Sequence, residues 1–144
     1  MDRDTILEWA ASRKVEALTD DKLPDQVLLR DALGSGLPIR VAVLPERYTI
    51  WFQVEFAETI PEDRYMELSR AIAIMNAQIF VGSWNLLSSR GALYFKLSLP
   101  TKGVTYTPEG IDHLVQTVVQ TTRSTVTPLL NVGLKGAPAQ SVRT

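Results

Sequence analysis

The single histidine and a group of acidic residues are the side chains that could take part in catalysis. His113 follows Asp112, and several serines elsewhere in the chain could supply a hydroxyl group. A Ser-His-Asp triad needs a carboxylate that orients the imidazole through its second nitrogen. Adjacent residues on a helix point about 100° apart, so Asp112 is poorly placed to orient its neighbour. The pattern favours a solvent-exposed histidine in a first helical turn.

Four carboxylates lie close together in the sequence, at Glu55, Glu58, Glu62 and Asp63. Paired carboxylates can do acid–base chemistry where their surroundings move their pKa values apart. Glu62 and Asp63, however, fall in the first turn of a predicted helix, where negative charge stabilises the helix dipole. We predict no catalytic residue and no enzymatic activity, and keep an enzyme that uses the carboxylates of residues 55–63 as an alternative.

Metal and cofactor motifs are also missing from the sequence. The absence of cysteine excludes disulfides, thiolate catalysis and cysteine-ligated zinc. Asp20, Asp21 and Asp25 lack the spacing of a calcium loop, and Gly34-Ser35-Gly36 lacks the lysine of a phosphate-binding loop. We expect no metal and no cofactor.

The composition limits the classes of partner. Fifteen basic against sixteen acidic residues give a net charge of −1, which offers little attraction to nucleic acid. No apolar run approaches the ~18 residues of a membrane span, and no signal peptide is recognisable. With 144 residues, 45% of them hydrophobic, we expect a cytoplasmic protein with one domain over residues 1–132 and a mobile tail over 133–144.

A repeated pattern of two strands, a loop containing Thr, Pro and Glu, and an apolar helix indicates the architecture. The first copy predicts strands at 39–43 and 48–56 and a helix at 63–79. The second predicts strands at 84–88 and 92–99 and a helix at 110–127 that Pro128 ends or kinks. Two such units favour one antiparallel sheet with helices packed on one face.

The first third of the chain adds a helix and a strand. Thr5 and Glu8 fit a capping box, which predicts a helix over residues 4–14. Residues 19–25, rich in Asp, are predicted to form a loop, and residues 26–33 to form a strand. The expected fold class is α+β, in the order α-βββ-α-ββ-α, with about five strands.

Strict alternation in the two longest strands separates a core face from an outer face. The predicted core set is Ile50, Phe52, Val54, Phe56, Leu93, Phe95, Leu97 and Leu99. Trp51 and Tyr94 fall on the opposite faces, where polar residues are expected, together with Gln53 and Lys96. Large aromatic residues at such positions are candidates for partner contact. Alternatively, the helix of Trp9 or the loop from Thr19 covers them.

The order of elements and several segments resemble the YbjN-domain family of bacterial proteins. The resemblance lies in residues 68–79, 92–100, 107–111 and 128–130, and covers the first half of the chain only in element order. That family is described as sensory-transduction regulators and shares its fold with type III secretion chaperones. The resemblance implies a type III secretion chaperone-like fold and a non-catalytic, protein-contacting role, often as a homodimer.

We therefore expect a protein-interaction or chaperone-like regulatory module whose partner is a protein, either a second copy or another chain. The candidate partner contacts are Trp51, Gln53, Tyr94 and Lys96. A module that senses a small molecule, bound between the sheet and the helices, is the second hypothesis.

Overall fold

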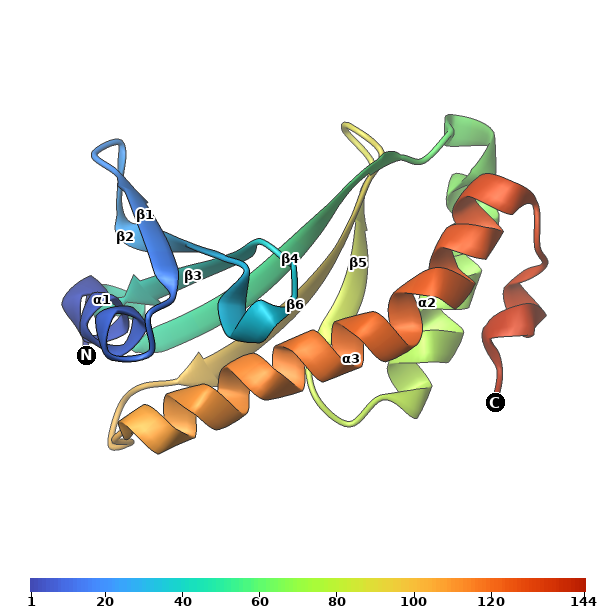
Figure 1. Ribbon diagram of the computed structural model, residues 1–144. Helices are drawn as coiled ribbons and strands as arrows, with labels where there is room; N and C mark the ends of the chain where they lie inside the picture. The colour runs from blue at the N-terminus through green and yellow to red at the C-terminus, as the bar shows by residue number, and fades with distance from the viewer. The chain divides into compact units, whose positions relative to one another are not determined.

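The computed structural model describes residues 1–144 and divides into two compact units (Figure 1). The first unit contains Met1–Val54 and Leu97–Val119, and the second contains Glu55–Lys96 and Gln120–Thr144. The strands form one open, antiparallel, six-stranded sheet in the order β1-β2-β3-β4-β6-β5. The α+β class is confirmed, with six strands in place of about five. The prediction of one domain over residues 1–132 stays a prediction.

The strands and helices are bounded as follows. The helices are α1 (Arg3–Ser12), α2 (Tyr65–Gln78) and α3 (Pro108–Lys135). The strands are β1 (Glu16–Asp20), β2 (Leu23–Arg30), β3 (Ile39–Leu44), β4 (Thr49–Thr59), β5 (Ser83–Leu87) and β6 (Ala92–Pro100). No helix is both long and apolar enough to cross a membrane.

The additional strand is β1, whose last two residues belong to the predicted loop of residues 19–25. The acidic composition marks only a tight turn, in which the Asp20 carboxylate accepts a hydrogen bond from the Lys22 backbone N–H at 2.9 Å. β1 pairs with β2 on either side of this turn, with Leu18 opposite Leu28. The loop prediction is therefore wrong for most of this segment.

The start of α1 also differs from the prediction. Asp2, and not Thr5, is the N-cap, and its carboxylate accepts from the backbone N–H groups of Asp4 at 3.0 Å and Thr5 at 3.4 Å. The helix ends at Ser12, and Lys14 has a positive φ of 57°. An acidic N-cap satisfies the same free donors that the predicted capping box would have satisfied, one turn earlier.

The core face of the two longest strands follows the alternation. Ile50, Phe52 and Val54 of β4 are fully buried, as are Leu93, Phe95 and Leu97 of β6 within 2% exposure. The remaining two members of the predicted set, Phe56 and Leu99, are half-buried. Phe95 lies against the Trp84 ring at a centroid distance of 5.5 Å, so its ring is part of an aromatic cluster.

Helix α3 continues through Pro128 and ends at Lys135, so the predicted end or kink at Pro128 is wrong as an end. Leu129 and Val132, beyond the proline, have no exposed surface. At Gly133 an added Cβ would lie 2.8 Å from the Cδ1 atom of Ile60, so this turn packs closely. Burial of the last turns offsets the lost backbone hydrogen bond at the proline.

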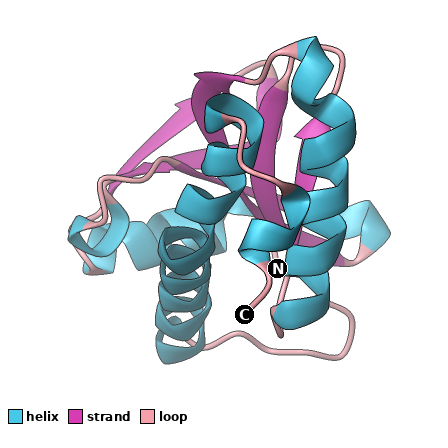
Figure 2. Ribbon diagram, turned by 90° about the vertical axis from the view of Figure 1, so that its right-hand side faces the viewer, coloured by secondary structure: helices cyan, strands magenta, loops and turns pink.

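In the second unit α2 packs against β5. Figure 2 distinguishes the helices from the strands by colour. The Asn76 side chain accepts from the Trp84 N–H at 2.8 Å and donates to the Trp84 carbonyl at 3.1 Å. The indole N–H of Trp84 donates to Thr125 of α3 at 2.8 Å. One tryptophan thus joins α2, β5 and α3.

Replacing Phe95 by Ala should lower the free energy of unfolding by roughly 3–5 kcal/mol, because it leaves a cavity beside Trp84 in a fully buried site. Urea titration measures the change. Ser98→Ala, at an exposed position on the same strand, is the control and should change stability by less than about 0.5 kcal/mol. A loss below about 1 kcal/mol for Phe95→Ala would show that this face is not the core.

Candidate functional site

Trp51 and Gln53 lie on the outer face of β4 in the first unit, each half-buried between fully buried neighbours. Their cross-strand partners on β3 are Ala42 and Arg40. Ala42 is fully buried although it shares this face. Because alanine is small, larger neighbours must cover it, and its directly paired neighbours are Trp51 and Gln26.

The strand pairing extends this face across the four strands β1 to β4. One cross-strand row contains Leu18, Leu28, Arg40 and Gln53, and the next contains Gln26, Ala42 and Trp51. Arg40 Nη1 donates to Gln26 Oε1 at 3.2 Å and links the two rows. We call these seven residues the outer face. They combine two leucines and one tryptophan with three polar side chains.

Two clefts border the outer face. One has a volume of about 610 Å³ and runs from Trp51 and Gln26 to the turn after β3, at Leu44, Pro45, Glu46 and Arg47. The other, of about 170 Å³, lies between Leu18, Leu28 and Arg40. Leu18 is 42% exposed and Leu23, at its rim, is 37% exposed. Apolar side chains therefore border an open surface.

Neither segment that could have covered Trp51 does so. The residues from Thr19 form the β1–β2 hairpin, which extends the sheet. Helix α1 is joined to α3, because the Trp9 indole N–H donates to Asp112 Oδ1 at 2.8 Å. Trp9 itself is 3% exposed. The role of Trp51 in partner contact stays a prediction.

The sequence analysis did not detect the contribution of Leu18, Leu28 and Arg40. Leu18 precedes the predicted loop of residues 19–25, in a segment for which no element was predicted. No sequence pattern predicts a role for Arg40, which the strand register places opposite Gln53. Strand pairing, which one sequence does not show, brings these side chains together.

Tyr94 and Lys96 lie on β6 in the second unit, and both are half-buried. Their partners on β5 are Asn85 and Ser83, so this row is polar. Asn85 donates to the Ser83 hydroxyl at 3.2 Å. The four predicted contact residues therefore form two pairs, one in each unit. Only the pair on β4, Trp51 and Gln53, shares its face with leucines, Leu18 and Leu28.

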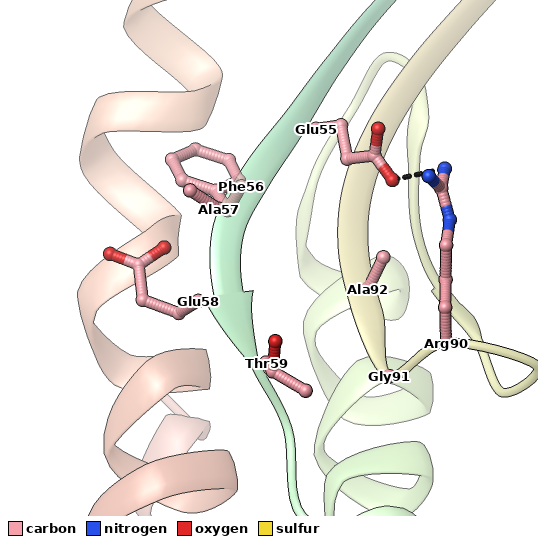
Figure 3. A pocket seen from close by; sticks show the side chains of 8 residues that line it. All are labelled: Glu55, Phe56, Ala57, Glu58, Thr59, Arg90, Gly91 and Ala92. Carbon is pink, nitrogen blue, oxygen red and sulfur yellow. Dashed lines mark ion pairs between the residues drawn. The ribbon is translucent and has the colours of Figure 1, made fainter.

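The carboxylates considered for catalysis do not converge. Glu55 forms an ion pair with Arg90 beside a cleft of about 510 Å³, whereas Glu58 lies on the other side of the strand (Figure 3). Glu62 and Asp63 are exposed in the 3₁₀ turn Glu62–Arg64. No group of three or more metal-ligating side chains is present. This arrangement offers no paired carboxylates for acid–base chemistry.

Asp112 binds Arg13 and Trp9 in place of orienting His113. Arg13 donates from Nε to Asp112 Oδ1 at 2.9 Å and from Nη2 to Oδ2 at 3.0 Å, a bidentate pair. His113 is exposed. The hydrogen bonds from Arg13, and then from Trp9, hold the pKa of Asp112 below its ordinary value. The carboxylate fastens α1 to α3.

With this geometry, the protein is an α+β chain of the YbjN-like, type III secretion chaperone-like fold. YbjN from E. coli, a proposed transcription regulator, matches with a TM-score of 0.63 and 16% identity over 92% of this chain and 89% of its own. The ExsC–ExsE complex matches with a TM-score of 0.57 and 14% identity over 83% and 90% of the two chains. An uncharacterised protein from Methanothermobacter thermautotrophicus matches at 0.64 and 7% identity, over 92% and 99%.

No protein-family model and no curated protein sequence matches the chain. The solved structures therefore establish the fold, and arguments about function rest on the surface residues of this chain.

Asp112→Asn should lower the unfolding midpoint at pH 7, because the charge-assisted bonds to Arg13 are lost. The folded-state pKa of Asp112 is depressed, so its contribution is present above the unfolded-state pKa of about 4 and is lost as the pH falls below it. The difference between wild type and variant should shrink on acidification. Asp21→Asn, in the exposed β1–β2 turn, is the control. An unchanged midpoint at pH 7 would show that the pair contributes nothing.

Proposed function

We propose that this chain is a non-catalytic protein-interaction module that acts as a chaperone-like regulator in the cytoplasm. The outer face of the first unit is the contact surface, and Trp51 is its central residue. The observation that supports this most directly is a half-buried tryptophan and a 42%-exposed leucine on an open sheet face, bordered by two clefts. Such apolar surface, rimmed by polar groups, is typical of protein contacts.

The compared structures support the same class of role. One of them holds ExsC together with ExsE, and another is a proposed regulator. The net charge of −1 favours a protein partner over nucleic acid or an anionic membrane. A second copy of the chain is one such partner, and Tyr94 with Lys96 is a second candidate contact on the other unit.

Aromatic side chains provide large contact area at low entropic cost, which is why they dominate many interfaces. Trp51→Ala should therefore weaken association by about 2 kcal/mol or more, roughly thirtyfold in affinity. Its stability in urea should stay nearly unchanged. Co-purification from the native cell tests binding to another chain, and sedimentation tests self-association.

Thr49→Ala is the matched control, because Thr49 lies two residues away on the same side of β4. It should bind as wild type does. If Trp51→Ala loses stability while its association is unaltered, Trp51 serves the fold and the proposal fails.

His113→Ala and Glu62→Gln should leave biological activity intact. His113 has no orienting carboxylate, since Asp112 binds Arg13 and Trp9, and Glu62 lies exposed in a 3₁₀ turn. A cellular assay at normal protein level and stability provides the measurement. Loss of biological activity in either variant would favour the enzyme hypothesis.

A further inference from the structure

The end of the chain packs against α2 in the second unit. After α3 the backbone turns at Gly136, with a φ of +75°, and residues 139–142 form a 3₁₀ turn beside α2 (Figure 1). Ala139 and Val142 are 5% and 2% exposed. We call residues 138–144 the C-terminal strap. Its composition, rich in small and polar residues, is that of a mobile segment, yet two of its side chains are buried.

All the hydrogen bonds from the strap to α2 go to one side chain. Gln78 Nε2 donates to the Val142 carbonyl at 2.9 Å. Gln78 Oε1 accepts from the Thr144 backbone N–H at 2.7 Å and from the Thr144 hydroxyl at 3.0 Å. A single glutamine thus pairs with main-chain groups at two positions, while two buried side chains supply the specificity. Short peptides are recognised by this combination of main-chain bonds and side-chain pockets.

The strap is anchored at its beginning and weakly held beyond it. Arg64 Nη2 donates to the Ala137 carbonyl at 2.9 Å, and the Ala137 N–H donates to the Asn131 carbonyl at 3.1 Å. From Pro138 onward the buried side chains of Ala139 and Val142 and the bonds to Gln78 hold it against α2. A segment at the end of the chain, with only two buried side chains, can open locally without global unfolding.

Beside the strap, the surface of α2 forms an open groove. A cleft of about 620 Å³ is lined by Ala73, Ile74, Ala77 and Gln78 of α2 and by Arg143 and Thr144 of the strap. The side chains from α2 carry no charge. Arg143, the one charged side chain in the lining, donates to Gln140 of the strap at 3.0 Å. The groove on α2 therefore suits an uncharged, partly apolar segment.

We propose that the surface of α2 under the strap, together with the groove beside it, is a peptide-docking site and that the strap is its resident intramolecular ligand. The partner is a segment of another protein with the same pattern, a small residue followed three positions later by a branched aliphatic residue in one helical turn. It replaces the strap and takes over the bonds to Gln78. This surface shares no residue with the outer face, so the proposed peptide docking does not depend on Trp51.

A labelled peptide with the sequence of residues 137–144 is the probe, titrated into the full-length chain. Val142→Ser weakens the strap and leaves the groove intact, so this variant should bind the peptide about tenfold more tightly than wild type does. Adding Gln78→Ala to that variant should remove the gain. Val104→Ser, at a 44%-exposed valine of the first unit, is the matched control and should bind as wild type. A peptide with Asp in place of Val should not bind.

Hydrogen exchange gives an independent measurement on the wild-type chain. The Thr144 N–H is bonded to Gln78 and the Trp84 N–H to Asn76, at 2.7 and 2.8 Å, both through a side-chain amide oxygen of α2. Thr144 should exchange at least about tenfold faster, because the strap opens locally and β5 does not.

Equal exchange of the two amides, or equal peptide affinity of wild type and folded Val142→Ser, would overturn the proposal. So would peptide binding that survives Gln78→Ala. A dimer that Gln78→Ala abolishes, without peptide binding to Val142→Ser, would show instead that copies of the chain exchange their straps.

Discussion

Three long elements, β4, β6 and α3, contribute residues to both compact units, and each buries one face over most of its length. On α3 the buried face includes Ile111, Val115 and Val118 in the first unit and Leu129 and Val132 in the second. Both sets have almost no exposed surface. This requirement explains why a 28-residue helix rich in Thr and Val, with an internal proline, forms at all.

The same requirement determines what the opposite faces can do. A strand that buries every second residue must display the residues between them. On β4 these include Trp51 and Gln53, next to β3 and β2 residues that also point outward. Trp51 lies opposite the core face, where it covers Ala42 and is itself half-buried. The proposed partner contact would account for an aromatic side chain there, because large apolar surface on an open sheet is otherwise selected against.

The sequence predicts those parts of the fold that depend on local period. The alternation at residues 50–54 and 93–97 is visible in one sequence, and the structure buries all six core residues of those two runs. The strand β1 was missed because its pairing with β2, and not its composition, stabilises it. The end of α3 was placed too early because Pro128 is a local signal, whereas the burial of Leu129 and Val132 is tertiary.

Residues far apart in sequence account for what could not be predicted at the candidate sites. Asp112 meets Trp9 and Arg13 across about a hundred residues, and Gln78 meets Val142 and Thr144 across more than sixty. Neither pairing follows from a motif, because a single carboxylate or glutamine has many possible partners. His113 and the acidic residues at 55–63 were candidates for catalysis because they have neighbours of suitable chemistry in the sequence. Proximity of that kind does not bring functional groups to one point on a helix or strand.

The two proposed surfaces differ in how they would respond to a partner. The outer face is open, so binding there depends only on the contacts made. The strap already covers part of the docking surface on α2, and a covalently attached ligand has a high effective concentration. If the strap is closed about 99% of the time, a partner binds about a hundredfold more weakly than to the open groove. A change that loosens the strap would therefore increase affinity without altering any contact of the partner. The stability of the strap on α2 would therefore set the affinity of this surface for a partner.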